Sequence, residues 1–303
     1  MSAEKLQNLN LFQAWIMASR PKTLPAAAAP VVVGSVLAYM DGRFNWLPAL
    51  AALLGALLLQ IGSNVANDLY DFQRGTDAGE RLGPVRVTQA GLLSLEQVRN
   101  GMLLIFGLAA LVGLYLALHA GWVVVGIGLA AILSAIAYTG GPFPYGYHGL
   151  GDIFVFIFFG LAATVGTYYV QALTTSPLAW WMAISMGLLI VAILVVNNIR
   201  DYENDRQANK HTLVVIFGLQ FARGEYVACV VIAYLLPMIV WFLGLMPATG
   251  FLVYLSIPMA VRAIQTIYTE QGRALNKALA GTGRLTLVYA LLFSAGILVY
   301  RFF

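Results

Sequence analysis

Two clusters of acidic, amide and basic side chains stand out in a chain that otherwise carries few charges. The first cluster is centred on Asn67 and Asp71, and the second begins about 130 residues later at Asn197 and continues through Asp201 and Asp205. Within each cluster, the Asn and Asp residues follow one another at intervals of four. Residues four apart lie on the same face of a helix, so their oxygen atoms can point the same way. The repeated spacing indicates two similar half-bundles that offer oxygen ligands to a shared cavity.

Oxygen ligands grouped at helix ends favour a hard divalent cation. Mg²⁺ usually binds one or two carboxylates and completes its coordination with water and substrate phosphates. An Asp at a membrane helix centre costs about 2.5–3.5 kcal/mol, and a bound cation would offset part of such a cost near the lipid. We therefore predict Mg²⁺ as cofactor, with these ligands: Asn67, Asp71, Asp77, Asn197, Asp201 and Asp205. The predicted catalytic residues are the four carboxylates of this set: Asp71, Asp77, Asp201 and Asp205.

Basic side chains alternate with these carboxylates, which a site for metal alone would not require. Phosphate oxygens that lie beyond a metal do need cationic partners. We therefore predict a diphosphate site with these cations: Arg74, Arg81, Arg206 and Lys210. The alternative is a solvated loop with scattered ion pairs. We disfavour it because the Asn–x3–Asp spacing occurs twice in a chain that avoids charge elsewhere.

The composition indicates where such a site must be built. Of the 303 residues, 60% are hydrophobic and 10% are charged, whereas soluble domains carry roughly 25% charged residues. The mean hydropathy is +0.81, which predicts an integral membrane protein. These values exclude a soluble enzyme, a disordered chain and a basic-faced nucleic-acid-binding protein, so no nucleic-acid partner is expected. The single Cys229 excludes a disulfide framework and a cysteine-based metal site.

Nine apolar runs are long enough to cross a bilayer as helices. We predict an all-α, polytopic membrane protein whose single domain covers residues 1–303. The nine predicted runs are Leu24–Met40, Trp46–Ala66, Gly101–Leu118, Trp122–Tyr138, Ile153–Val170, Leu178–Ile199, Tyr226–Leu245, Phe251–Ile267 and Leu285–Phe303. Pro30, Pro237 and Pro258 fall inside these runs and predict kinks.

The distribution of basic residues predicts the orientation in the membrane. All but Arg43 and Arg301 of the 17 Lys and Arg residues belong to the amino-terminal arm, to the regions that follow the second, sixth and eighth runs or, in the case of Arg262, to the end of the eighth run. By the positive-inside rule, these regions are cytoplasmic. We therefore expect the amino terminus and the catalytic loops in the cytoplasm, with the carboxyl terminus periplasmic, in a bacterial inner membrane.

Several motifs resemble those of the UbiA superfamily of intramembrane aromatic prenyltransferases, over nearly the whole chain. The resemblance is strongest to the branch that acts on 1,4-dihydroxy-2-naphthoate in menaquinone biosynthesis. The motifs that carry it are Arg20-Pro-Lys-Thr-Leu-Pro25, Asn67-Asp-Leu-Tyr-Asp71, Gly75-Thr-Asp77, Arg81-Leu-Gly-Pro-Val-Arg86, Pro144-Tyr-Gly-Tyr147, Gly149-Leu-Gly-Asp152, Asn197-Asn-Ile-Arg-Asp201, Asp205-Arg206 and Lys210.

The resemblance implies a magnesium-dependent transfer of a polyprenyl group from its diphosphate to 1,4-dihydroxy-2-naphthoate. Carbon dioxide would be lost, and demethylmenaquinol and diphosphate would be the products. It also implies nine helices around a central cavity that opens to the cytoplasm and sideways to lipid, without an obligate protein partner. The residues that we expect on the acceptor side are Arg86, Tyr145, Tyr147 and Asp152. The rings of Tyr145 and Tyr147 could also shield an allylic cation.

Two alternatives remain open from the sequence. A prenyltransferase of the same kind could use another aromatic acceptor, such as 4-hydroxybenzoate or homogentisate. A secondary transporter could also be built from two similar halves, but it would place ionisable residues or broken helices near the bilayer midplane. Here the acidic residues lie at the ends of the apolar runs, which disfavours the transporter.

Overall fold

The computed structural model describes residues 9–75 and 82–302, and in this part of the chain every regular element is helical. The long α-helices are α3 (Leu24–Met40), α4 (Trp46–Gln73), α5 (Leu95–Ala120), α6 (Trp122–Ala137), α8 (Ala163–Ala172), α9 (Pro177–Arg200), α11 (Leu213–Phe242), α12 (Ile257–Thr269) and α13 (Leu275–Phe302). The short α-helices are α2 (Leu11–Ser19), α7 (Gly151–Val155) and α10 (Tyr202–Gln207). The other helical segments are η1 (Pro21–Thr23), η2 (Tyr145–Tyr147), η4 (Ala248–Ser256) and η5 (Gly272–Ala274), which are 3₁₀, and η3 (Phe156–Ala162), which is π-helical.

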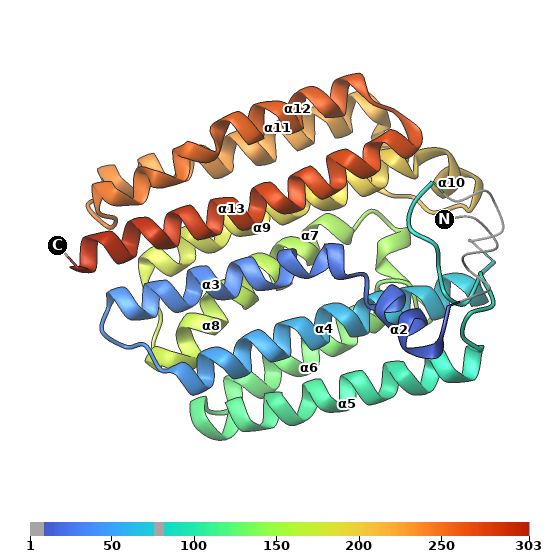
Figure 1. The fold of residues 1–303 in the computed structure, drawn as a ribbon, viewed down its shortest axis with the longest axis horizontal. Helices are drawn as coiled ribbons and strands as arrows, with labels where there is room; N and C mark the ends of the chain where they lie inside the picture. The colour runs from blue at the N-terminus through green and yellow to red at the C-terminus, as the bar shows by residue number, and fades with distance from the viewer. Residues whose placement is uncertain (1–8, 76–81, 303) are drawn as a thin grey trace.

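The helices form one bundle (Figure 1), with α11, α12 and α13 on one side, α4, α5 and α6 on the other, and α3 and α8 between them. Eight segments of the described chain are long and apolar enough to cross a membrane. Each of the nine predicted runs is helical, but α6 has 16 residues and spans only about 24 Å, against a hydrocarbon core of about 30 Å. The count of nine spans therefore stays a prediction.

Several helices begin earlier than the apolar runs that predicted them. Helix α5 begins at Leu95 rather than Gly101, α11 at Leu213 rather than Tyr226, and α13 at Leu275 rather than Leu285. In α5 the added turns start with a capping box between Ser94 and Gln97, which satisfies amide groups of the first turn. Hydropathy marks the part of a helix that meets lipid, whereas hydrogen bonding lets the helix continue beyond it.

The three prolines do not play the same part. Pro30 and Pro237 lie inside α3 and α11, as predicted. Pro258 lies in the first turn of α12, directly after the 3₁₀ segment η4. The helix type thus changes next to this proline, and the kink predicted there stays a prediction. An unpredicted break occurs in α11 at Gly218, where φ is 86°, a conformation that glycine adopts without strain.

Helix α9 supports the site by packing closely against its neighbours. Met182, Met186 and Leu189 of this helix are fully buried in the main hydrophobic core. Where α9 meets η3, a Cβ atom added to Gly160 would lie 2.6 Å from the Cα of Gly187. Such close approach requires glycine and is common where membrane helices pack together. Helix α9, whose last turn carries part of the second acidic cluster, is thus closely packed in the bundle.

Candidate functional site

A cavity of about 1130 Å³ lies within the bundle, and both acidic clusters contribute to its wall. Its polar end is lined by Arg20, Lys22, Asn67, Asp71, Arg86, Asn197, Arg200, Asp201, Asp205 and Lys210. Asp71 comes from the last turn of α4, and Asp201 directly follows α9. The two carboxylates are therefore brought to one cavity although they are 130 residues apart in the chain.

Asp71 is buried and held on both of its oxygen atoms. The hydroxyl of Tyr147 donates a hydrogen bond of 2.6 Å to its Oδ1, and Arg86 forms an ion pair with its Oδ2. Arg86 also donates from Nη1 to the backbone oxygen of Asn67 at 2.6 Å. Arg86 and Tyr147, which we expected on the acceptor side, therefore contact the first acidic cluster directly.

Arg74 and Asn67 connect α4 to the turn that follows α6. The side-chain oxygen of Asn67 accepts a hydrogen bond of 3.0 Å from Thr139 Oγ1. Arg74 donates to the backbone oxygens of Thr139 at 3.0 Å and Gly141 at 2.5 Å. Because Arg74 is exposed and does not line the cavity, its contacts fix the end of α4 rather than present a cation to the cavity.

Arg200 organises the second cluster. Its guanidinium donates to both carboxylate oxygens of Asp201 and to the side-chain oxygen of Asn197, the latter at 2.7 Å. It also donates to Asn276 Oδ1 on α13 at 3.0 Å, and Asn276 in turn donates to the backbone oxygen of Leu82 at 2.8 Å. One side chain thus joins α9, α13 and the loop before α5.

Lys210 lies between the two clusters. Its Nζ is 3.3 Å from Asp205 Oδ1 and 5.7 Å from the centre of the Tyr147 ring. Burial raises the pKa of the Asp205 carboxyl above its ordinary value. Burial by itself would lower the pKa of Lys210, but the carboxylates around it, Asp205 first, raise that pKa above its ordinary value. Lys210 therefore stays cationic beside both clusters.

Other predicted site residues lie elsewhere. Asp77 and Arg81 are outside the described residues. Arg206 is exposed on α10, and Asp152 is buried in α7; neither lines the cavity. Tyr145 does line it, with its hydroxyl 2.9 Å from Ser134 Oγ.

Three cations of the cavity wall were not in the predicted site, namely Arg20, Lys22 and Arg200. Each has a signal in the sequence. Arg200 directly precedes Asp201, and Arg20 and Lys22 belong to a short basic motif before the first long apolar run. That signal is weak because basic residues at helix ends are equally explained by membrane orientation.

The donor set at the polar end suits a hard cation that also binds a phosphate. The available ligands are carboxylate and amide oxygens, and the buried Oδ2 of Asp205 has no hydrogen-bond partner among the described residues. Among residues 9–75 and 82–302, no three His, Cys, Asp or Glu side chains come close enough to hold a metal by themselves. Mg²⁺ commonly takes one or two carboxylates and obtains its other ligands from phosphate and water.

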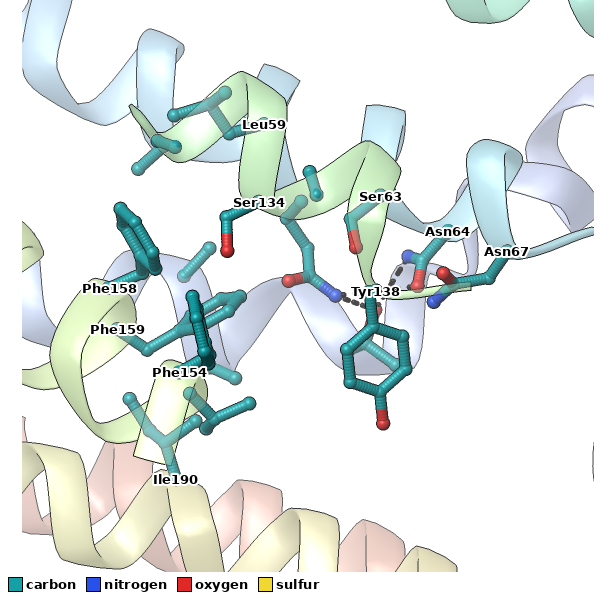
Figure 2. Close-up of a pocket in the computed structure, with 18 of the residues that line it drawn as sticks. Leu59, Ser63, Asn64, Asn67, Ser134, Tyr138, Phe154, Phe158, Phe159 and Ile190 are labelled. Carbon is teal, nitrogen blue, oxygen red and sulfur yellow. Dashed lines mark hydrogen bonds between the residues drawn. The ribbon is translucent and has the colours of Figure 1, made fainter. Parts of the chain in front are cut away.

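Beyond the polar end the cavity becomes aromatic and aliphatic (Figure 2). Ser63 and Ser134 point toward the middle of the cavity, and the rings of Phe154 and Phe158 border the same space. Farther along, the wall is formed by small and aliphatic side chains, for example those of Val112, Leu116 and Val124. A ligand that fits the whole cavity therefore has an anionic group, a flat or polar middle and a hydrocarbon tail.

The chain is similar to known proteins over nearly its whole length. The model of the UbiA prenyltransferase family matches residues 27–288. A 1,4-dihydroxy-2-naphthoate octaprenyltransferase of Escherichia coli (strain K12) is 40% identical over 301 residues, which cover 96% of this chain and 97% of the relative. A protein of the same name from Mycobacterium tuberculosis (strain ATCC 25618 / H37Rv) is 39% identical over 283 residues, covering 92% and 95%.

Solved structures share the fold at low sequence identity. A UbiA homologue from Aeropyrum pernix K1 superposes with a TM-score of 0.69 and 15% identity, covering 93% of this chain and 99% of the other. A UbiA homologue from Archaeoglobus fulgidus bound to GPP and Mg²⁺ has a TM-score of 0.66 and 17% identity, covering 94% and 99%.

Proposed function

The chain belongs to the UbiA prenyltransferase family, and we propose that it transfers a polyprenyl group from polyprenyl diphosphate to 1,4-dihydroxy-2-naphthoate. The acceptor loses CO₂, and the products are demethylmenaquinol and diphosphate, a step of menaquinone biosynthesis. Relatives that carry the name of this activity cover nearly all of the chain at 37–40% identity, which supports both the reaction and the acceptor.

One structural observation carries the proposal: the two acidic clusters line the same cavity together with several cations. Among the described residues, the cavity wall carries five Lys and Arg side chains but only three Asp side chains. The excess positive charge favours an anion with several oxygens, as a diphosphate has. The hydrophobic continuation of the same cavity suits an isoprenoid tail.

The residues of the chain have distinct parts in this reaction. Asp71, Asp201 and Asp205, with Asn67 and Asn197, would hold Mg²⁺, which neutralises negative charge on the leaving diphosphate when it is bound. Arg86, Arg200 and Lys210 are placed to bind the remaining phosphate oxygens. Charge developing on the diphosphate is thereby stabilised by groups already in position.

The chemistry proceeds by breaking the carbon–oxygen bond to the diphosphate, which leaves with the bonding electrons. The ring carbon that bears the carboxylate supplies the electrons for the new carbon–carbon bond. The bond to CO₂ then breaks, and its electron pair restores the aromatic ring. Tyr145 and Phe154 face the cavity between the charged and the hydrophobic parts, where they exclude water and stabilise the allylic cation by their ring faces.

We further propose that the protein lies in the bacterial inner membrane, with the polar end of the cavity toward the cytoplasm, the carboxyl terminus periplasmic and the hydrophobic end opening sideways to lipid. The charge asymmetry of the loops supports this orientation. If there are nine spans, the carboxyl terminus is periplasmic. A reporter that is active only in the periplasm should then be active when it is fused after Phe303. Activity of a cytoplasmic reporter at that position would contradict the nine-span topology.

The decisive experiment supplies purified protein with Mg²⁺, one polyprenyl diphosphate and a panel of acceptors: 1,4-dihydroxy-2-naphthoate, 4-hydroxybenzoate and homogentisate. We expect prenylated product, CO₂ and diphosphate only with the naphthoate. Product from another acceptor alone would overturn the proposed acceptor. Failure to release diphosphate with any acceptor would overturn the enzymatic assignment and favour the transporter.

A further inference from the structure

The proposed function leaves the acceptor site to be located, because two of the residues first expected there have other partners. Arg86 forms an ion pair with Asp71, and Tyr147 donates a hydrogen bond to it. Asp152 does not line the cavity. The acceptor has to lie next to the diphosphate yet outside the cationic end, since its ring must meet the first carbon of the isoprenoid.

Helix α4 provides a polar stripe that runs from the acidic cluster into the cavity. Gln60, Asn64, Asn67 and Asp71 are spaced four, three and four residues apart and therefore lie on one helix face. All four line the cavity. At 1.5 Å per residue, Gln60 lies about 16 Å along the axis from Asp71, and Ser63 about 12 Å. This interval is long enough for a diphosphate followed by an aromatic ring.

The hydrogen-bond network fixes which way the amide of Gln60 faces. The hydroxyl of Thr23 donates its only proton to the backbone oxygen of Arg20 at 2.9 Å. Thr23 can therefore only accept from Gln60 and Asn64, each of which approaches it at 3.0 Å with its amide nitrogen. An Asn or Gln amide is oriented by such a network. The oxygen of the Gln60 amide must then point away from Thr23.

That oxygen is an acceptor without a partner. Gln60 is only 9% exposed, and its Oε1 has no hydrogen bond among the described residues. This oxygen is not completely buried. Because Gln60 lines the cavity, the oxygen is accessible there. A ligand hydroxyl would satisfy it, and a ligand without a hydroxyl would leave a nearly buried polar atom unpaired.

The opposite wall of the same region is a row of aromatic rings. The Tyr145 and Phe154 rings are stacked, with centroids 4.0 Å apart and an interplanar angle of 21°, and Phe158 continues the row at 6.3 Å and 22°. The π-helical turn that begins after Val155 lets both Phe158 and Phe159 line the cavity, as such turns often re-aim side chains at functional sites. A flat bicyclic ligand can extend this stack.

We propose that a flat bicyclic phenol, the dihydroxynaphthoate of the proposed function, binds between Gln60 and the aromatic row Tyr145–Phe154–Phe158, with one ring hydroxyl donating to Gln60 Oε1. Ser63 lies on the same side as Gln60 and offers a second hydrogen-bonding group. Donation from the ring hydroxyl to Gln60 increases electron density on the ring, which assists its attack on the isoprenoid carbon. Gln60 is thus a determinant of acceptor specificity.

The test measures acceptor binding separately from catalysis. Binding of 1,4-dihydroxy-2-naphthoate, 1-hydroxy-2-naphthoate and 4-hydroxy-2-naphthoate is followed by naphthoate fluorescence, with Mg²⁺ and inorganic pyrophosphate in place of the prenyl donor. The wild type should bind at least one of the two monohydroxy compounds about tenfold more weakly than the dihydroxy compound. In Gln60→Met this difference in affinity should disappear, because methionine lacks the amide oxygen that accepts the hydrogen bond.

Two further variants keep the test decisive. Phe154→Leu should weaken binding of all three compounds by a similar factor. Gln265→Met, on the exposed face of α12, makes the same chemical change far from the cavity and should bind like the wild type. The inference is overturned if Gln60→Met, still folded by thermal unfolding, keeps the hydroxyl discrimination, or if Phe154→Leu binds all three compounds like the wild type.

The outcome separates this inference from the proposed function on which it rests. If the wild type prenylates dihydroxynaphthoate but the variants bind acceptors unchanged, only the location of the acceptor is wrong. If the wild type does not prenylate it, the proposed function fails whatever the variants bind.

Discussion

Arg200 donates hydrogen bonds to both carboxylate oxygens of Asp201, at 2.8 Å and 2.5 Å, and the Arg200 side chain is only 1% exposed. Asp71 has a similar partner in Arg86, and Asp205 has Lys210. Each of these carboxylates is therefore neutralised by a cation of the chain itself. In the proposed reaction, these cations would be adjacent to the phosphate oxygens and could transfer hydrogen bonds to them.

Removal of Arg200 should reduce both stability and activity. In Arg200→Gln, Asp201 loses its ion-pair partner in a largely buried place, which destabilises the fold by about 3–5 kcal/mol. The double variant Arg200→Gln/Asp201→Asn should recover most of that stability but not prenyl transfer. Thermal unfolding in detergent and the transfer assay measure the two effects. Equal stability of the single and double variants would contradict the role of Arg200 as the partner of Asp201.

Replacement of Asp71 or Asp201 should strongly reduce turnover. Asp71→Asn and Asp201→Asn keep the size of the side chain but remove the charge that holds a metal. We expect each to lower kcat by about 10²–10³. Glu96→Gln, on the exposed first turn of α5, is the matched control and should retain full activity. Near-normal turnover by both Asp variants would show that the metal ligands are misassigned.

The hydroxyl of Tyr147 should matter independently of its ring. Tyr147→Phe removes the 2.6 Å hydrogen bond to Asp71 but keeps a ring beneath the ammonium of Lys210. We expect an increase of about five- to tenfold in the Mg²⁺ concentration needed for half-maximal activity, from loss of about 1 kcal/mol. Tyr147→Ala should increase it further. Identical Mg²⁺ titrations for wild type and Tyr147→Phe would exclude a role for the hydroxyl.

Chelation should stop the reaction reversibly. Treatment with EDTA should abolish product formation, because negative charge on the leaving diphosphate would no longer be neutralised by a metal ion, and added Mg²⁺ should restore it. Asp205→Asn should need more Mg²⁺ for the same recovery, since Asp205 Oδ2 is a buried oxygen without another partner among the described residues. Turnover that persists in excess EDTA would contradict metal dependence.

The close contact of η3 with α9 should tolerate no added methyl group. A Cβ at residue 160 would lie 2.6 Å from Gly187 Cα and 2.9 Å from the backbone oxygen of Ala183, so Gly160→Ala should lower the free energy of unfolding by about 1–3 kcal/mol. Gly126→Ala is the control, because a Cβ there has nothing within 4 Å. It should be neutral or slightly stabilising, since Ala is the better helix former. Comparable unfolding temperatures for both variants would contradict this packing.

Membrane insertion, helix positions and the two acidic clusters could be predicted from the sequence because they depend on local properties. Length and apolarity of a run determine whether it can cross lipid, and four-residue spacing determines whether Asn67 and Asp71 share a helix face. The first residues of several helices were predicted too late in the chain, for example Gly101 instead of Leu95 for α5. Hydropathy does not detect the polar turns with which these helices begin.

The partners of the site residues could not be predicted from spacing. Arg86 reaches Asp71 only because the loop before α5 folds back against α4, and Tyr147 reaches the same carboxylate from the turn after α6. Spacing reveals neither contact, and the resemblance had led us to expect both residues on the acceptor side. Gln60 gave no signal at all, because a lone amide in an apolar run resembles any polar residue that faces a neighbouring helix.

Run length and composition were enough to identify a helical membrane protein with oxygen-rich helix ends, since lipid constrains both directly. The shared cavity of Asp71 and Asp201, the burial of Arg200 against Asp201 and the aromatic wall of the cavity became evident from the folded bundle. Contacts between helices depend on packing over the whole bundle, whereas membrane partition and helix periodicity are properties of each segment alone.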